Sequence, residues 1–370
     1  MVGQTEHPIL SYHPWKAVFK LAYVGFVIAR LPLWLTNSLF PFLRPSPIWT
    51  FKQTLMSRIM YAVLDMTSRV GVTETPKVTK GTRDDGFQMM EPFPSEFYRG
   101  ELAVEHTRPT TVAATWYPHS LNRDIGSKTV VLYLHGGAFV LGDSSEQFCG
   151  FIAKTFLEHG NADILLSVQY RLSGYSLLNP FPAAVQDALT SYLFLINTLH
   201  VPAHQIVLAG DSAGGNLAIA LLRYIQEYGT ELNVPSPKCC VLYSPWAAPF
   251  DFDIAKNPNF HADWLPPSFL RWGAHAYGAS LHDPATHRYI TPLGNPFTTS
   301  TPIFVNYGSL EIFDKNITRW AQEMKEKGNS VEIHRETGAP HDTLLLGDFL
   351  GFQESATKVA LKVRAFISKT

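Results

Sequence analysis

The pattern Gly-x-Ser-x-Gly around Ser212 constrains the fold of this chain more than any other feature. An apolar run at 206–208 precedes it, and apolar residues follow it at helical spacing: Leu217, Ala220, Leu221, Tyr224 and Ile225. This order predicts a strand, a sharp turn and a helix, with the serine at the turn. Gly210 and Gly214 let backbones approach closely at such a corner. The segment therefore predicts a nucleophilic serine, with a packing turn or an anion site at the helix N-terminus as alternatives.

A second glycine-containing loop, His135-Gly136-Gly137-Ala138, follows a predicted strand at 129–134. Attack by a serine needs a base, and the oxyanion that forms needs hydrogen-bond donors. Glycines expose their N–H groups, so we expect the N–H groups of Gly136, Gly137 and Ala213 to form an oxyanion hole. His135 is a candidate base, although a role in shaping the loop is preferred.

The preferred base is His341. It lies in a loop with Gly338 and Pro340, about 130 residues after the serine, and follows a short predicted strand at 331–333. Fourteen histidines are present, but this one follows the last predicted strand. A serine, then an acid, then a histidine is one of the chain orders in which catalytic triads occur.

Two carboxylates compete for the position of the acid, after a predicted strand at 302–306. Glu311 lies in the loop itself, close to the end of the strand. Asp314 opens a predicted helix that stops at Gly328, where an aspartate is most simply an N-cap. The sequence favours Glu311, which would hold the imidazole tautomer and stabilise the imidazolium, and leaves Asp314 as the alternative.

Together these motifs resemble the hormone-sensitive-lipase-like branch of the α/β-hydrolases, and within it fungal membrane-associated esterases and steryl-acetate deacetylases. The resemblance covers roughly residues 128–345. It is carried by His135-Gly136-Gly137, Gln169-Tyr170-Arg171-Leu172, Asn179-Pro180-Phe181-Pro182-Ala183-Ala184 with Asp187, Gly210-Asp211-Ser212-Ala213-Gly214-Gly215, Ser244-Pro245-Trp246 and Pro340-His341.

The resemblance implies an α/β-hydrolase fold, with a mostly parallel central sheet, helices on both faces and a helical cap. It also implies a serine esterase that needs no cofactor. Three positions depart from the pattern of the branch. Ala138 replaces the third glycine of His-Gly-Gly-Gly, Gln169 replaces an Asp before Tyr-Arg, and Glu311 replaces the catalytic Asp. Glutamate is an accepted acid in this fold.

We therefore expect a serine carboxylic-ester hydrolase (an esterase or deacetylase) that works through an acyl-enzyme, with Ser212, Glu311 and His341 as its catalytic residues. Its expected substrate is an apolar small-molecule ester, such as a sterol, lipid or secondary-metabolite ester. A transacylase, a lactone-forming enzyme and an amidase or formamidase would use the same triad and stay open as alternatives. A non-catalytic ligand-binding protein is the non-enzymatic alternative, against which the presence of His341 argues.

Composition agrees with one large domain and additions to it. The chain has 370 residues, of which 46% are hydrophobic and 16% are charged, enough for a core of about 250 residues with a cap. A net charge of -1 gives no electrostatic argument for nucleic acid. Three cysteines form no disulfide framework. No cluster has metal-ligand spacing, so that neither a metal nor a cofactor is expected.

The first hundred residues differ in kind. Residues 15–43 are apolar and aromatic, interrupted by Lys16, Lys20 and Arg30. On a helix these cations fall within an arc of roughly 80°, as in a helix that lies in a membrane interface with its cations toward the headgroups. The uncharged run at 21–29 is too short to span a bilayer. A membrane-associated protein, for example of the endoplasmic reticulum, is expected. A cap helix of a cytoplasmic protein and a cleaved signal peptide are the alternatives.

The predicted organisation has three parts. Residues 1–45 form the membrane-associating or cap segment. Residues 46–100 form a helical cap, with a helix at about 49–65, and a polar linker at 73–86. Residues 101–370 form the catalytic domain, with a cap insertion at about 250–290. The many aromatic residues of this insertion suggest a bulky apolar group in the substrate.

Overall fold

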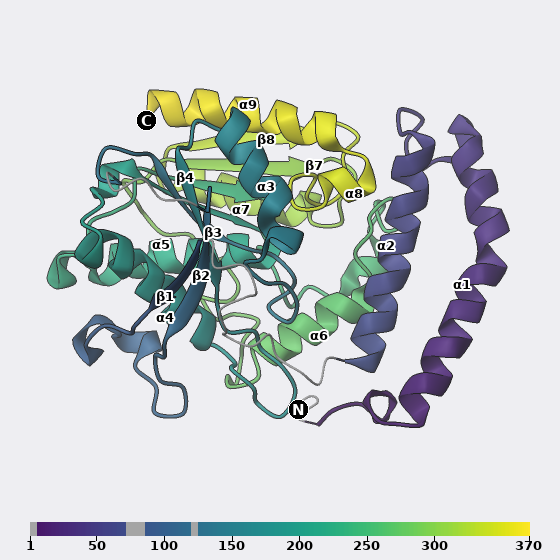
Figure 1. Cartoon of the computed structure of the whole chain (residues 1–370), viewed down its shortest axis with the longest axis horizontal. Coiled ribbons are helices and arrows are strands. Elements are labelled where there is room, and N and C mark those ends of the chain that lie inside the picture. Colours follow the sequence, from purple (N-terminus) through teal and green to yellow (C-terminus); the bar gives the residue numbers. More distant parts are fainter. Residues whose placement is uncertain (1–5, 72–85, 120–124) are drawn as a thin grey trace.

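The computed structural model describes residues 6–71, 86–119 and 125–370, and the centre of this described part is an eight-stranded sheet (Figure 1). The strand order is β1-β2-β4-β3-β5-β6-β7-β8. The pairs β1–β2 and β2–β4 are antiparallel, and all the others are parallel. The strands are β1 Phe87–Met90, β2 Val112–Tyr117, β3 Val130–Leu134, β4 Ile164–Gln169, β5 Ile206–Asp211, β6 Cys239–Tyr243, β7 Ile303–Gly308 and β8 Val331–Glu336.

Helices cover both faces of this sheet. Side chains of α4, α5 and α7 share one apolar core, and side chains of α3 and α9 share the other. Alternate residues of β3 enter the two cores, which is why this strand is apolar throughout. The arrangement confirms the predicted α/β-hydrolase fold. The helices are α1 Trp15–Leu39, α2 Phe51–Val70, α3 Glu146–His159, α4 Ala183–Leu193, α5 Ser212–Leu232, α6 Pro267–Tyr277, α7 Asp314–Glu326, α8 Gly347–Leu350 and α9 Gln353–Lys369.

The parallel strands place three loops at one edge of the sheet. Strands β5, β7 and β8 run in the same direction, so the segments that follow them leave from the same edge. Ser212 follows β5 directly, and the loops after β7 and β8 carry Glu311 and His341. This is the edge at which open α/β sheets hold their ligands.

A helical hairpin, formed by α1 and α2, lies beside the catalytic part of the chain (Figure 1). A capping box between Thr50 and Gln53 starts α2. The hydroxyl of Tyr23 in α1 donates to the carboxylate of Asp65 in α2 over 2.8 Å. On its other side α2 packs against α6, where the hydroxyls of Ser68 and Ser268 are hydrogen bonded. The amino-terminal region is thus docked on the part of the chain that was predicted to form the cap.

Two of the predicted segments correspond to helices of the structure. The helix expected at about 49–65 is α2, which continues to Val70, and the segment expected as a cap insertion contains α6. Residues 1–5 of the amino-terminal segment, and the predicted linker apart from Gly86, lie outside the described residues. The division of the chain into three parts stays a prediction.

Candidate active site

Ser212 stands at the corner between β5 and α5, in a backbone conformation that few residues other than glycine adopt. Its φ is +51°, in the left-handed region. Packing holds this strained turn in place. A Cβ on Gly210 would overlap the backbone of Gly214, and a Cβ on Gly214 would overlap the end of β3 at Leu134. The two glycines therefore allow the corner to lie against β3, with the serine at its tip.

The N–H group of Gly136 is already occupied by another acceptor, which corrects one of the three predicted oxyanion donors. It donates instead to the Oδ1 of Asp211 over 2.8 Å. The hydroxyl of Tyr133 donates to the same oxygen. Asp211 is fully buried and therefore needs such partners. The first glycine of the loop ties the loop to the serine corner, and its N–H is occupied.

Two neighbouring N–H groups are free to act as such donors. Among the residues that the structure describes, none accepts a hydrogen bond from the N–H of Gly137 or of Ala138. Both residues have positive φ values, 106° and 54°, which turn the loop sharply at this point. The N–H of Ala213 belongs to the first turn of α5, which has no partner within the helix. The N–H groups of Gly137, Ala138 and Ala213 are therefore available as donors for an oxyanion.

Glu311 is the carboxylate that lies beside His341. Its Oε1 is 3.7 Å from the Nδ1 of His341, and both side chains are almost completely buried. The other oxygen, Oε2, accepts from the hydroxyl of Ser244 at 2.6 Å and from the N–H of Gly308 at 2.8 Å. A separation of 3.7 Å is an ion-pair contact and not yet a hydrogen bond. Such contacts between catalytic groups often shorten when substrate binds.

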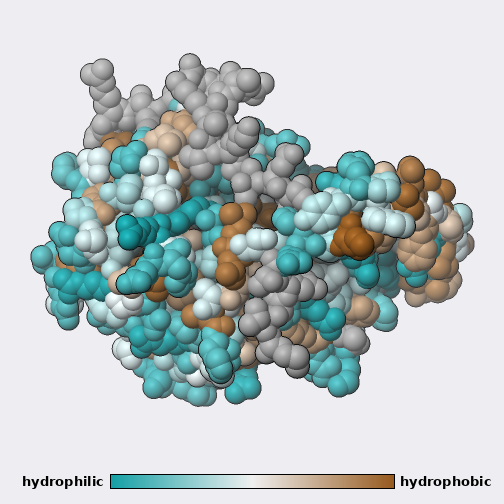
Figure 2. Space-filling model, turned by 90° about the horizontal axis from the view of Figure 1, so that it is seen from below, coloured by the Kyte–Doolittle hydropathy of each residue, from teal (hydrophilic) through white to brown (hydrophobic). Residues whose placement is uncertain are grey.

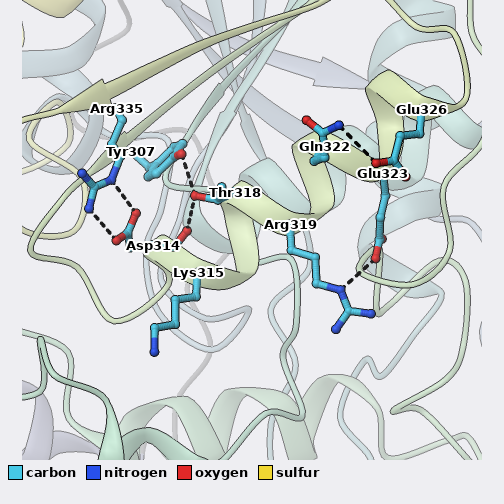
Figure 3. Close-up of a pocket in the computed structure, with 9 residues that line it drawn as sticks. All are labelled: Tyr307, Asp314, Lys315, Thr318, Arg319, Gln322, Glu323, Glu326 and Arg335. Carbon is cyan, nitrogen blue, oxygen red and sulfur yellow. Dashed lines mark hydrogen bonds and ion pairs between the residues drawn. The ribbon is translucent and has the colours of Figure 1, made fainter.

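Asp314 occupies a different environment. It forms a two-pronged ion pair with Arg335 of β8, with both nitrogen–oxygen distances at 2.8 Å (Figure 3). Its predicted role as an N-cap is wrong, since Phe313 holds the N-cap position of α7 and Asp314 is the first helical residue. The arginine neutralises the aspartate, so Asp314 does not compete with Glu311 for the histidine.

The loop that carries His341 is held by Asp263, which the sequence did not single out. This buried carboxylate accepts the N–H of His341 at 3.2 Å and the N–H groups of Trp264 and Ile312 at 2.8 Å. The indole of Trp264 in turn donates to the carbonyl of His341 at 2.7 Å. The segment before α6 is therefore fastened to the histidine loop and to the loop of the acid. Three loops far apart in the sequence meet there, and only their contact in space reveals the role of Asp263.

Aromatic residues connect the segments that carry Ser212 and His341. The N–H of Trp246 donates to the carbonyl of Ser212 at 2.9 Å. The ring of Trp246 stacks on that of Phe313, and the edge of Phe313 contacts the imidazole with 5.1 Å between ring centres. Trp246 and Phe313 therefore tie the segment of Ser212 to the loop of His341.

Burial and neighbouring charges set the ionisation of the pair. Burial raises the pKa of Glu311 to about 7, although the neighbouring His341 acts in the opposite direction. Burial alone would lower the pKa of His341. The carboxylates of Glu311, Asp263 and Asp342 outweigh burial, so that the pKa of His341 lies above its ordinary value of 6.5. A histidine of raised basicity suits proton abstraction from a serine hydroxyl.

His135, the other candidate base, is confined to its own loop. Its ring stacks on Tyr170 at 4.4 Å between centres, and its Nδ1 contacts the carbonyl of Gly136 at 2.7 Å. Burial lowers the pKa of His135 to about 4, and the imidazole is therefore neutral at pH 7. These contacts agree with the preferred role of shaping the loop.

A buried pair of carboxyl groups joins the serine corner to the histidine loop. Asp211 precedes Ser212, Asp342 follows His341, and the two side chains interact directly. Each has an Oδ2 that no other described residue binds. Burial, followed by the charge of Asp342, raises the pKa of Asp211 well above its ordinary value. We therefore expect one proton to be held between these two oxygens, which would link the loops of Ser212 and His341.

The comparison with known families gives one match over more than half of the chain. A family model described as an alpha/beta hydrolase fold matches residues 131–345. Its first matched residue lies in β3, so the α1–α2 hairpin is outside the match.

Similar proteins of known activity are ester hydrolases. An acetyl-hydrolase of Streptomyces hygroscopicus is 32% identical over 207 residues, which are 54% of this chain and 63% of that protein, just under two thirds of its length. Esterase LipU of Mycobacterium tuberculosis is 30% identical over 59% of this chain and 71% of that protein. An ethyl acetate hydrolase of Pseudomonas putida is 24% identical over 60% of this chain and 67% of that protein.

Solved structures agree. A hormone-sensitive lipase from a metagenome library has a TM-score of 0.56 and 25% identity, and the match covers 69% of this chain and 82% of that chain. An esterase of Pyrobaculum calidifontis has a TM-score of 0.60 and 23% identity over 70% and 82% of the two chains, which shows the fold alone. The resemblance to the hormone-sensitive-lipase-like branch of the α/β-hydrolases is confirmed.

The contrast between Glu311 and Asp314 can be measured directly. We expect Glu311→Gln to lower kcat by about 10²-fold or more, because it removes the charge that stabilises the imidazolium. Asp314→Asn should leave kcat nearly unchanged and cost about 0.5–1 kcal/mol of stability, since its ion pair with Arg335 is partly exposed. Turnover of a chromogenic ester and urea unfolding separate the two effects. Equal losses of kcat in the two variants would contradict the assignment of the acid.

The raised pKa of His341 predicts the pH dependence. The base must be neutral, so kcat/KM should fall as the pH decreases through a value above 6.5. Glu311→Gln removes the nearest charge that raises this pKa and should move the acidic limb of the profile to lower pH. Asp314→Asn is the matched control and should not move it. An acidic limb that stays in place in Glu311→Gln would show that another group titrates.

The carboxyl pair predicts unequal effects of two substitutions at Asp342. In Asp342→Asn the amide can donate to Asp211 in place of the shared proton, and its oxygen can still accept the N–H groups of Leu344 and Leu345. Asp342→Ala leaves a buried oxygen of Asp211 without a partner, at a cost of about 1–3 kcal/mol. Urea unfolding should therefore rank the wild type and Asp342→Asn together, well above Asp342→Ala. If both variants lose the same stability, the two groups do not share a proton.

Proposed function

The chain belongs to the α/β-hydrolase-fold family and carries the machinery of a serine carboxylic-ester hydrolase, and from this premise we propose that it is an esterase for an apolar small-molecule ester. The single observation that carries the proposal is the meeting of three elements at one sheet edge. These are the strained serine corner, the loop with free N–H groups, and the buried pair of Glu311 and His341.

In the proposed reaction, the Oγ of Ser212 attacks the carbonyl carbon of the ester while His341 removes the hydroxyl proton. The N–H groups of Gly137, Ala138 and Ala213 hold the resulting oxyanion. The tetrahedral intermediate collapses, and His341 gives its proton to the departing alcohol. Water then attacks the acyl-enzyme with His341 again as the base, and the carboxylic acid leaves as Ser212 recovers its proton. The residues present suffice for each of these steps.

The acyl group is proposed to be short and the alcohol bulky and apolar. The acetyl-hydrolase and the ethyl acetate hydrolase among the relatives support a short acyl group such as acetyl. Aromatic rings support the apolar alcohol. Trp264 and Phe313 each make an edge-to-face contact with the imidazole, and Trp246 stacks on Phe313. A sterol, lipid or secondary-metabolite acetate has these properties.

Association with a membrane is the second part of the proposal. The helix α1 is long and apolar enough to cross a bilayer by length and composition alone, and only 6% of its apolar window is buried. Large apolar side chains that face solvent in this way usually mark a contact with a membrane or another protein. Flotation of the full-length chain with liposomes tests this part.

A panel of substrates tests the activity. We expect the acetate of a bulky apolar alcohol to be cleaved with a higher kcat/KM than its octanoate or than the amide analogue, with release of free acid. Ser212→Ala should lower the rate by about 10⁴-fold or more, because the acyl-enzyme cannot form. Cys149→Ser, which changes a buried side chain outside the site, is the control for the preparation. If the acyl group is transferred to an added alcohol in preference to water, the enzyme is a transacylase and not a hydrolase. If the amide analogue is cleaved faster than the ester, the enzyme is an amidase.

A further inference from the structure

The exposed apolar side chains gather on the hairpin. In the described part of the chain, 16 of the 22 large apolar residues that are exposed lie between Ile9 and Phe51. Figure 2 shows hydrophobic atoms concentrated at the end of the molecule that is formed by α1. Leu21 is 75% exposed and Ile28 is 62% exposed. Such a continuous patch differs from the single apolar residues that are scattered over ordinary protein surfaces.

The cations of α1 lie on the opposite side from this patch. Tyr23 points to α2, because it is hydrogen bonded to Asp65. At about 100° per residue, Lys16, Lys20 and Arg30 all fall within roughly 60° of Tyr23 around the helix. The outer side of α1 is therefore uncharged from Ala17 to Leu39, and the cations follow the edge of the groove between α1 and α2.

Arg58 of α2 lies level with Arg30 of α1. In this antiparallel hairpin, each arginine stands seven residues, about two turns, from the hydrogen-bonded pair of Tyr23 and Asp65. No described residue forms a hydrogen bond or an ion pair with either arginine. Burial, then the charge of Arg30, lowers the pKa of Arg58. The guanidinium carbon of Arg30 lies 4.8 Å from the centre of the ring of Phe26. Two facing cations without a carboxylate are unfavourable unless an anion joins them.

Asp65, the carboxylate between α1 and α2, already has hydrogen-bond partners of its own. Asp65 accepts from Tyr23, Arg69 and Ser268, all within 2.8 Å. Residues 6–71 contain seven lysines and arginines against one glutamate and one aspartate. This region therefore has a net charge of +5, whereas the whole chain has -1. A groove of about 450 Å³ with aromatic walls runs beside Arg30, and Phe19, Trp34 and Tyr61 line it.

The same contacts argue against α1 as a helix that crosses the bilayer. Crossing would break the hydrogen bond of Tyr23 and bury two cations of α1 in hydrocarbon. The partner helix α2 cannot follow, because it is bound to the catalytic part of the chain. Its Ser68 binds Ser268, its Gln53 donates to the carbonyl of Gly351, and its Lys52 donates to that of Asp348.

We propose that α1 lies in the plane of one membrane leaflet, with its outer side among the acyl chains, and that Arg30 and Arg58 together bind the phosphate of an anionic phospholipid. The proposal rests on the membrane association put forward above. A phosphate with its negative charge is the group that two guanidinium forks recognise best. An in-plane helix buries its apolar side about 5–10 Å deep and keeps its cations at the level of the headgroups.

Vesicle binding separates the headgroup site from the apolar anchor. The full-length chain is floated with vesicles of phosphatidylcholine alone and with vesicles that also contain phosphatidylglycerol. Arg30→Gln with Arg58→Gln should weaken binding to the anionic vesicles by roughly 25-fold, about fivefold for each cation, and leave binding to neutral vesicles unchanged. Lys362→Gln with Arg364→Gln removes two exposed cations of α9 and is the matched control, which should behave as the wild type.

A third variant changes the anchor itself. Leu21→Glu with Ile28→Glu places two charges on the outer side of α1 and should abolish binding to both kinds of vesicle. If Leu21→Glu with Ile28→Glu abolishes binding while the double arginine variant keeps the wild-type preference for anionic vesicles, the apolar anchor is supported and the phosphate site is wrong. If the wild type floats with neither vesicle, the membrane association fails, and the inference fails with it. A dimer in solution that Leu21→Glu with Ile28→Glu dissociates would assign the patch to a second copy of the chain.

The depth of the helix tests its orientation. Single cysteines at Leu21 and Leu39 carry a fluorophore, and the three native cysteines are buried and do not interfere. Eighteen residues of helix separate the two sites by about 27 Å. An in-plane helix places both fluorophores at one depth, so that the same depth-calibrated lipid quencher acts best on both. Optimal quenching at clearly different depths would show that α1 crosses the bilayer and would overturn the proposal.

Discussion

The strained turn at Ser212 is the constraint on which the rest of the site depends. A positive φ at a residue with a side chain is stable only where the surroundings leave no alternative. Here β3 packs against the corner because Gly214 has no side chain to prevent the approach, and Gly210 lets the two arms of the corner come close together. The carboxylate of Asp211 then fixes the neighbouring loop through the N–H of Gly136. The position of the nucleophile and that of the oxyanion donors are therefore consequences of one backbone corner.

Contacts in space, and not along the chain, explain what the sequence could and could not predict. Strand β5, the corner and α5 follow from local patterns, and so do the loops of Glu311 and His341, because apolar periodicity and glycine positions act over a few residues. Whether a particular N–H group is free to bind an oxyanion does not follow from such local patterns. Gly136 is as well placed in the sequence as Gly137, and only its bond to Asp211 excludes it. Asp263 and the carboxyl pair were missed for the same reason, since their partners lie 49 to 131 positions away.

A continuous series of contacts links the amino-terminal hairpin to the catalytic residues. Helix α1 packs on α2, α2 packs on α6, and the segment before α6 holds the loop of His341 through Asp263. Gly273 of α6 also lies against Ala138, where a side chain would overlap the oxyanion loop. The hairpin that exposes an apolar surface is therefore joined, through α6, to the loop of Ala138. An apolar ester that is dissolved in a membrane would meet the protein at this end of the molecule.

The central claim is that Ser212 is the nucleophile, and covalent labelling tests it most directly. The full-length protein is treated with a fluorophosphonate, digested and analysed by mass spectrometry. We expect one phosphonyl group, on the peptide that contains Ser212, and loss of ester hydrolysis in proportion to the labelling. Labelling of a different residue, or full hydrolysis after Ser212 is completely modified, would contradict the claim.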